Sequence, residues 1–245
     1  AEGIQGLVLD VKTGNGAFMQ TPDDSRALAK SLVSIGKGYG IKTTALITDM
    51  NQPLGSAIGN WFEMEESVRG LQGNGPADLM DITYALGAEI LRMSNPDLSQ
   101  EAAIDLQTKT VADGSAFEKL KRITELQGGD PSVLDNLGKY PKAKYSGAIK
   151  APESGYLAQV DTMALGFAGI QLGAGRLKIT DAIDYSSGMY IHTRIGDSLN
   201  RGDDILTVYS NDEKSLNELL ARGEDIFSIE QTPPEMPPLI LERIG

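Results

Sequence analysis

The feature that most constrains the fold is a short apolar run that ends at a glycine-rich turn and leads into a capped helix. Residues 7–11 (LVLDV) are mostly aliphatic and too few for a helix, so they predict a strand buried on both faces. Gly14 and Gly16 then allow either a simple tight turn or a close approach of the backbone to a small ligand. Thr21 and Pro22 are typical of a helix N-terminus. This order of elements is typical of an α/β protein with a ligand site at the carboxyl edge of its sheet.

A second apolar run extends this unit into a sheet. Residues 22–35 have helical spacing, and residues 43–48 (TTALIT) predict another buried strand. A strand that follows a strand and a crossover helix in one sheet is expected to be parallel to the first. The pattern then stays helical, with breaks at glycine and proline. The predicted helices span residues 61–71, 79–93, 99–112 and 116–126.

The pattern changes at about residue 144, where short strands alternate with turns. Strands are predicted at residues 145–150, 155–160, 189–193, 205–209 and 238–243, and helices at residues 162–172 and 216–220. We therefore predict an α/β domain at residues 1–142, with a partial, mostly parallel sheet flanked by helices. An α+β domain is predicted at residues 143–245.

Composition excludes several classes of function. The 245 residues contain no cysteine, which excludes disulfides and thiol chemistry and fits a cytoplasmic location. The single histidine, His192, lies in an alternating strand pattern, so we interpret it as a surface residue without a catalytic role. The net charge of −12 argues against a nucleic acid or an anionic membrane as partner. No apolar run approaches the roughly 20 residues of a membrane span.

Acidic residues on the predicted helix after the second strand leave two interpretations open. Glu63 and Glu66 lie three residues apart, on one helical face and near a loop that offers carbonyl oxygens. Such a set suits an oxygen-ligated cation, but a solvated acidic face has the same pattern. The pattern alone therefore supports an α/β protein that binds a polar or anionic small molecule, without a named reaction.

Several long motifs along the chain are more specific than this general pattern and occur in the same order as in a known protein family. The sequence resembles the pyrimidine nucleoside phosphorylase and thymidine phosphorylase family over essentially its whole length. The motifs that carry this resemblance are residues 10–18 (DVKTGNGAF), 45–55 (ALITDMNQPLG), 71–79 (LQGNGPADL), 172–176 (LGAGR) and 195–197 (IGD).

The resemblance implies phosphorolysis of thymidine or uridine to the free base and (deoxy)ribose 1-phosphate. Phosphate is then a co-substrate, no organic cofactor is needed, and the family's enzymes are cytoplasmic homodimers. Closure of a helical domain onto the α/β domain is expected to position the substrates and to stabilise a loose transition state.

The resemblance also assigns roles to a few side chains. Phe18 matches a position that lines the pyrimidine pocket, with core packing after the turn as the alternative. Leu54 and Ala57 match positions whose carbonyl oxygens bind a structural cation, usually potassium, and Glu66 matches its carboxylate ligand. No catalytic residue carries over. We interpret Asp10 and Lys12 as a structural ion pair beside the hinge.

The sequence departs from the family pattern by lacking its glycine- and serine-rich phosphate loop, its helical domain and the residues that grip the pyrimidine. We therefore expect a C-terminal portion that is inactive alone and self-associates through the open edge of its sheet. We also expect it to bind potassium weakly or not at all, because three ligands are fewer than the about six that hard cations prefer. The alternative is a non-catalytic module that binds an ion or a partner chain.

The last third has a second resemblance. Residues 151–157 (APESGYL) and 195–203 (IGDSLNRGD) resemble the barrel-sandwich hairpins of biotinyl and lipoyl carriers. Those carriers present a modifiable lysine, typically between two methionines, and no such turn exists in this sequence. We therefore interpret these barrel-sandwich-like strands as the phosphorylase C-terminal domain.

Overall fold

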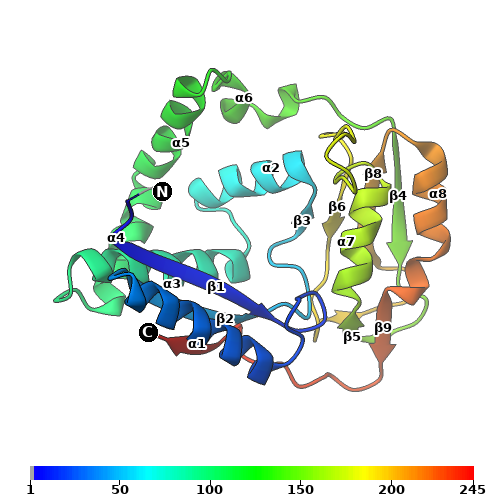
Figure 1. The fold of residues 1–245 in the computed structure, drawn as a ribbon. Helices are drawn as coiled ribbons and strands as arrows, with labels where there is room; N and C mark the ends of the chain where they lie inside the picture. Colours follow the sequence, from blue (N-terminus) through cyan, green and yellow to red (C-terminus); the bar gives the residue numbers. More distant parts are fainter. Residues whose placement is uncertain (1–2) are drawn as a thin grey trace.

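Two parallel strands and the helix between them form one side of the molecule (Figure 1). In the computed structural model, which describes residues 3–245, β1 (Gly6–Thr13) pairs in parallel with β2 (Lys42–Asp49). The helix α1 (Pro22–Gly38) makes the crossover and packs against both strands. The predicted strand–helix–strand unit is therefore confirmed.

The start of α1 is fixed by local side-chain chemistry. The hydroxyl of Thr21 accepts a hydrogen bond from the N–H of Asp24 at 3.2 Å, which satisfies one of the unpaired donors of the first turn. Pro22 occupies the first turn, where the backbone N–H that proline lacks would have no helical partner. The predicted cap is confirmed.

The two strands differ in burial. Ala45 and Ile47 of β2 are at most 1% exposed, whereas Leu7 to Leu9 of β1 are only partly buried. The prediction that the first strand is buried on both faces is wrong. Within residues 3–245, β1 pairs only with β2, so its outer edge stays open and solvent reaches its side chains.

The third strand of this sheet comes from the other end of the chain. β10 (Ile240–Ile244) pairs antiparallel with β2, and the sheet has the order β1-β2-β10. A closing strand was predicted at nearly these residues, but its partner was not. The chain therefore returns to its first sheet after building the second half of the molecule.

The helical segment covers this sheet and then leads away from it. α3 contacts β1 and β2, α4 packs on α3, and α5 contacts α4 and, more weakly, α2 (Figure 1). All four main helices begin and end within two residues of their predicted bounds. The elements are α2 (Asn60–Leu71), α3 (Ala77–Ser94), α4 (Gln100–Ala112), α5 (Ser115–Leu126), α6 (Ser132–Asp135) and the 3₁₀ helix η1 (Leu137–Lys139).

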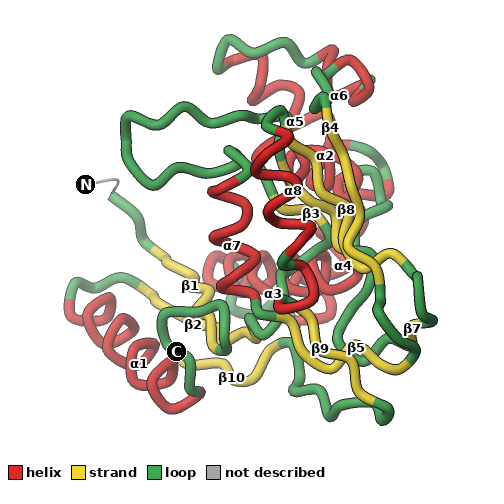
Figure 2. The backbone as a smooth tube through the Cα atoms, turned by 90° about the vertical axis from the view of Figure 1, so that its right-hand side faces the viewer, coloured by secondary structure: helices red, strands yellow, loops and turns green. Residues whose placement is uncertain are grey.

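Two further small sheets form the second half, with strand orders β3-β6-β8-β4 and β7-β5-β9. Figure 2 shows α7 and α8 on the same side of strands β4 and β8. No closed barrel forms within residues 3–245. The elements are β3 (Ala57–Ile58), β4 (Tyr145–Lys150), β5 (Gly155–Val160), α7 (Thr162–Gln171), β6 (Gly188–Ile191), β7 (Ser198–Leu199), β8 (Asp204–Ser210), α8 (Glu213–Ala221), η2 (Gly223–Asp225) and β9 (Phe227–Glu230).

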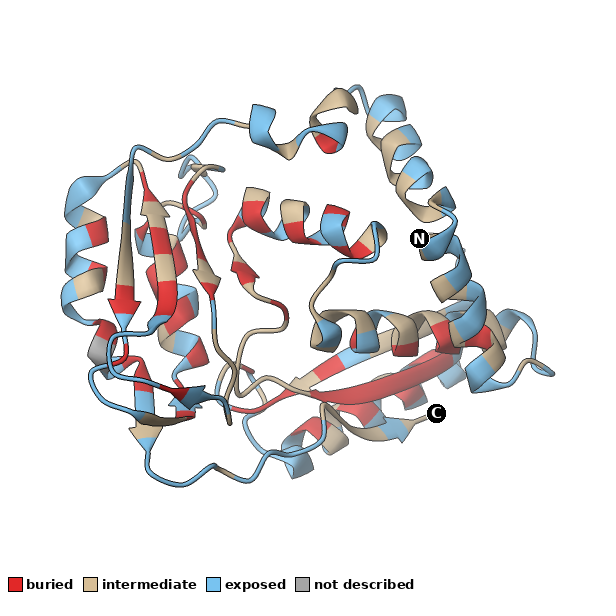
Figure 3. Ribbon diagram, turned by 180° about the vertical axis from the view of Figure 1, so that it is seen from behind, coloured by how far each residue is buried: buried red, intermediate tan, exposed pale blue. Residues whose placement is uncertain are grey.

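Buried side chains form two separate cores (Figure 3). The larger core lies in the second half and includes Leu157, Met189 and Leu206, each without measurable exposure. The smaller core lies between α1 and the first sheet and includes Ala29 and Ile47. The predicted architecture, an α/β part followed by an α+β part, is confirmed at this level.

The division into domains at residue 142 stays a prediction, and two strand pairings cross it. β10 joins the first sheet, and β3 pairs antiparallel with β6 in the second half. Among the helices of the described residues, none combines the length and the apolar composition needed to cross a membrane.

Candidate functional site

The glycine turn after β1 lies against the loop after β2, at the carboxyl edge of the parallel pair. The N–H of Gly16 donates to the carbonyl of Met50 at 3.0 Å, and the N–H of Met50 donates to the carbonyl of Thr13 at 2.6 Å. Gly14 has a φ of 118°, and a Cβ there would lie 2.8 Å from the amide oxygen of Asn51. The close approach permitted by the glycines is therefore made to the protein's own second loop.

Asn15, between the two glycines, connects this turn to the second half of the molecule. Its Nδ2 donates to the carbonyl of Val160 at 2.9 Å, and its Oδ1 accepts from the N–H of Thr162 at 3.0 Å. These two bonds join residues about 145 positions apart and fix the turn to the start of α7. Sequence reasoning missed this role because asparagine is common in any glycine turn.

Lys12 is engaged by two neighbouring side chains of the sheet, Asp10 and Thr48. Its Nζ lies 2.6 Å from a carboxylate oxygen of Asp10 and donates to the hydroxyl of Thr48 at 3.0 Å. The hydroxyl of Thr48 donates to the other carboxylate oxygen of Asp10. The predicted ion pair is confirmed, so the ammonium group of Lys12 is already paired with a carboxylate.

Phe18 is the most exposed large apolar side chain of the edge. Its ring is fully accessible to solvent, whereas the preceding Ala17 is buried. The alternative interpretation of Phe18, as a core residue, is therefore wrong. Its predicted role in binding a pyrimidine stays a prediction, and the structure places the ring beside the glycine turn, free to contact a ligand or another chain.

The candidate cation site lies in the loop at residues 52–57. Glu66 of α2 is 6% exposed, and its Oε1 accepts hydrogen bonds from the N–H groups of Ser56 at 2.7 Å and Ala57 at 3.1 Å. A Cβ at Gly55 would lie 2.2 Å from Oε2 of the same carboxylate. Gly55 also has a φ of 70°, so the loop needs glycine there for both space and conformation.

A guanidinium group from the second half holds the same loop. Arg194 donates to the carbonyl of Pro53 at 3.1 Å and to the hydroxyl of Ser56 at 3.3 Å. It also lies 3.4 Å from the carboxylate of Asp78, which accepts from the N–H of Gly55 at 3.1 Å. The loop is thus held by side chains from α2, from α3 and from the segment after β6.

Burial raises the pKa of Glu66, because a charged carboxylate loses solvation there. The two backbone N–H groups and the charge of Arg194 oppose this shift. Burial likewise raises the pKa of Asp49 in the loop after β2, against the hydrogen bonds from Asn51. For both Glu66 and Asp49, hydrogen bonds and charges from the protein therefore offset only part of the solvation that the ionised carboxylate loses on burial.

These residues fit the implied potassium site only in part. Ala57 and Glu66 are brought together, but the N–H groups of Ser56 and Ala57 already occupy Oε1 of the implied carboxylate ligand. Leu54 lies in the same loop, partly buried. Residues 3–245 contain no group of three or more acidic, histidine or cysteine side chains suited to a metal ion. The nearby Arg194 already supplies positive charge.

His192 is exposed, and its Nε2 lies 2.7 Å from the hydroxyl of Thr207 on the neighbouring strand. The interpretation of this histidine as a surface residue is confirmed.

Comparison with known proteins connects this geometry to a family. Residues 1–117 match the family model described as glycosyl transferase family, a/b domain. Residues 156–230 match the model of the pyrimidine nucleoside phosphorylase C-terminal domain. The first match contains the glycine turn and the Glu66 loop, and the second contains Arg194.

Curated relatives match along nearly the whole chain. A pyrimidine-nucleoside phosphorylase of Geobacillus stearothermophilus is 39% identical over 245 residues, which are 100% of this chain and 56% of the relative. One of Staphylococcus epidermidis is 39% identical over 230 residues, 94% of this chain and 53% of the relative. One of Staphylococcus aureus is 42% identical over 211 residues, 86% of this chain and 49% of the relative.

The chain belongs to the pyrimidine nucleoside phosphorylase family. It spans about half the length of the curated relatives it matches. The family placement also decides between the two resemblances of the last third. The C-terminal model of the phosphorylases covers residues 156–230, which include the carrier-like segment 195–203 and the end of the segment 151–157. These strands are therefore those of a phosphorylase C-terminal domain.

Sequence reasoning missed Asp78 and Arg194, which hold the candidate cation loop of this phosphorylase-family chain. Both lie in or beside motifs that carried the resemblance, residues 71–79 and 195–197. Their partners are 23 to 141 positions away in the chain, and local periodicity contains no information about such contacts.

Proposed function

We propose that this chain takes part in the phosphorolysis of pyrimidine nucleosides. Phosphate attacks C1′ of the nucleoside, the bond between C1′ and the base nitrogen breaks, and the base leaves with a proton from its surroundings. The observation that carries the proposal is 39–42% identity to pyrimidine-nucleoside phosphorylases over 86–100% of the chain. Thymidine and uridine are the proposed nucleosides.

The edge turn is the proposed place of base binding in this chain. The exposed ring of Phe18 offers an apolar wall for a pyrimidine, and the turn is rigidly held by Met50 and Asn51. A ring carried on a turn held in this way can position a substrate, and positioning lowers the barrier to a reaction between two bound substrates.

We further propose that the 245 residues alone are inactive. Binding phosphate and stabilising the developing charge require cations or N–H donors that are free to contact it. At this edge Lys12 is paired with Asp10, and Arg194 is paired with Asp78 and the loop carbonyls. The relatives are about twice as long, and we propose that their remaining part supplies the phosphate-binding groups.

The test is base release from thymidine and uridine in the presence of phosphate, followed by chromatography. The chain alone is expected to release no base above the uncatalysed rate. Addition of the segment of the Geobacillus relative that the chain does not match is expected to restore release. Measurable phosphorolysis by the chain alone would disprove the proposed inactivity. If the two parts bind each other but release no base, the result would favour the alternative that this chain is a non-catalytic module.

One observation supports that second candidate. The outer edge of β1 has no strand partner within residues 3–245, and Phe18 is fully exposed nearby. An open edge next to an apolar side chain is a surface that pairs readily with another chain. A non-catalytic module would use it for a partner chain, whereas the phosphorylase would use it for its remaining part or for self-association.

A further inference from the structure

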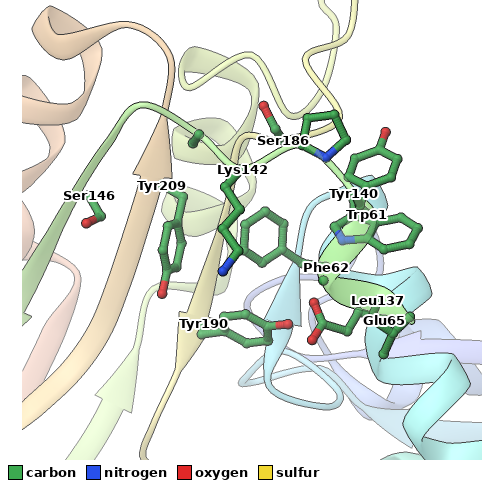
Figure 4. Close-up of a pocket in the computed structure, with 13 residues that line it drawn as sticks. Trp61, Phe62, Glu65, Leu137, Tyr140, Lys142, Ser146, Ser186, Tyr190 and Tyr209 are labelled. Carbon is green, nitrogen blue, oxygen red and sulfur yellow. The ribbon is translucent and has the colours of Figure 1, made fainter. Parts of the chain in front are cut away.

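A cavity of about 410 Å³ lies between the two halves of the molecule, away from the edge turn (Figure 4). The first turns of α2 form one wall, the segment at residues 137–143 forms a second, and β6 and β8 form the third. The volume lies within the range of about 300–1,000 Å³ that is usual for small-molecule sites. None of its lining residues belongs to the glycine turn or to the loop held by Glu66.

Five aromatic rings line the cavity. Trp61 of α2 stacks on Tyr140 with ring centroids 3.8 Å apart and an angle of 8° between the planes. Phe62 meets Tyr190 edge-on, with centroids 5.1 Å apart, and Tyr190 is perpendicular to Tyr209 at 6.4 Å. Rings set at such angles present both faces and edges to a guest, and a planar ring can stack on one while its edge meets another.

The acidic group of the cavity is already compensated. Glu65 forms an ion pair with Arg69 one turn further along α2. The hydroxyl of Tyr190 points toward the same carboxylate (Figure 4). Burial, followed by the charge of Glu65, raises the pKa of Tyr190, so this hydroxyl stays protonated and can donate a hydrogen bond.

The basic group of the cavity has no such partner. Lys142 points its ammonium group between Tyr209 and Tyr190 (Figure 4). Salt bridges of lysine in the described part of the chain involve Lys12, Lys121, Lys150 and Lys214 instead. The hydroxyl of Ser146 also lines the cavity and can donate to an anion. The hydroxyl of Ser186 lines it too, but donates to the carboxylate of Asp184 at 2.8 Å. The free charge of the cavity is therefore positive, although the protein as a whole is acidic.

We propose that this cavity binds a small molecule that combines a planar aromatic ring with an anionic group. The ring lies among Phe62, Tyr190 and Tyr209, and the anion pairs with the ammonium of Lys142. A cationic guest would be repelled by Lys142, and an aliphatic acid would leave the rings without a stacking partner. The proposal does not depend on the phosphorolysis proposed above, because the two sites share no residue.

The position of Trp61 makes the test direct, since it is the only tryptophan of the chain and lines the cavity. Tryptophan fluorescence is followed while the 245-residue protein is titrated with phenyl phosphate. Phenol supplies the ring without the anion, and inorganic phosphate supplies the anion without the ring. Phenyl phosphate is expected to give a saturable change and a rise in Tm, and each of the two controls to bind much more weakly.

Two matched lysine variants locate the binding. Lys142→Gln removes the proposed anion partner and is expected to weaken phenyl phosphate binding by about fivefold. Lys144→Gln removes an exposed lysine two residues away, outside the cavity, and is expected to leave binding unchanged. Tyr209→Leu, which removes a ring from the wall, is expected to weaken phenyl phosphate and phenol alike.

Three results would overturn the proposal. The first is the absence of any saturable change with phenyl phosphate up to millimolar concentration, in both fluorescence and Tm. The second is equal binding by Lys142→Gln and Lys144→Gln. The third is tighter binding of phenol than of phenyl phosphate, which would make the cavity a site for neutral rings.

Discussion

The two halves of this chain differ in how they are stabilised. The second half has a large core, in which Leu157 and Leu206 are completely buried, and all of its strands except β10 lie in two small sheets. The first half has a small core under α1, a strand with an open edge and a fully exposed Phe18. The half that carries the proposed base-binding edge therefore has the smaller hydrophobic core of the two.

Polar contacts compensate for this difference. Asn15 and Arg194 each hydrogen-bond to backbone groups about 140 positions away, one at the glycine turn and one at the Glu66 loop. The two candidate loops of the first half are thus positioned by the second half. Loops positioned by a rigid scaffold are a common arrangement at binding and catalytic sites.

The largest expected effect separates the two cores. Leu206→Ala, at a side chain with 0% exposure in the larger core, is expected to lower the free energy of unfolding by about 2–5 kcal/mol. Leu9→Ala, in the partly buried β1, is expected to lower it by about 1 kcal/mol. Urea unfolding followed by circular dichroism measures both. Equal losses would remove the contrast between the halves.

A smaller effect tests the link between the halves. Arg194→Met removes the bonds to Pro53 and Ser56 and leaves the carboxylate of Asp78 without its cation. It is expected to lower the free energy of unfolding by about 1–3 kcal/mol. Arg201→Met, at an exposed arginine, is the control and is expected to change it by less than about 0.5 kcal/mol. An unchanged free energy of unfolding for Arg194→Met would show that the loop does not depend on Arg194.

Glu66 gives a pH-dependent test of the loop. Because burial raises its folded-state pKa, the folded protein binds the proton more tightly than the unfolded chain. The stability that Glu66 contributes is therefore present at acidic pH and falls as pH rises from about 4.3 through the raised pKa. The Tm of Glu66→Gln relative to the original protein is expected to rise over that window and then to stay constant.

Potassium extends the same experiment. Because two N–H groups occupy Oε1 of Glu66 and Arg194 supplies charge nearby, we expect KCl and NaCl to give equal Tm values in both proteins. A potassium-specific increase in Tm that disappears in Glu66→Gln would contradict this expectation and identify the loop as a working cation site.

The smallest stability effect is expected at Phe18. Its ring is fully exposed, so Phe18→Ala is expected to change the free energy of unfolding by less than about 0.5 kcal/mol. In the restored phosphorylase the same change is expected to weaken pyrimidine binding by about 1–3 kcal/mol, the usual effect of losing a buried apolar contact. Unchanged KM and kcat would remove Phe18 from the proposed site.

The local elements were predictable because each has a local cause. Thr21 and Pro22 mark the start of α1, and the glycines and prolines between the helices mark their ends. The strand–helix–strand order then determines that β1 and β2 are parallel. The position of β10 was not predictable, because its partner β2 lies about 200 residues earlier and any apolar strand has the same local pattern.

The candidate site was predictable only in its local part. Glu66 was found from its spacing to Glu63 near a loop and again through the resemblance, and its hydrogen bond to that loop spans only ten residues. Asn15 and Arg194 were missed because their partners lie in the other half. The aromatic cavity was missed for the same reason, since α2, β6, β8 and the 137–143 segment each contribute only a few residues to it.

Hydrogen exchange followed by mass spectrometry tests the contrast between the halves most directly. Amides of β6 and β8, around Met189 and Leu206, are expected to exchange last, at the rate of global unfolding. Amides of the β1 segment around Leu7 to Leu9 are expected to exchange well before them, because that strand is partly buried and pairs on one side only. If β1 is protected as strongly as β8, the first half is as stable as the second and the account is contradicted.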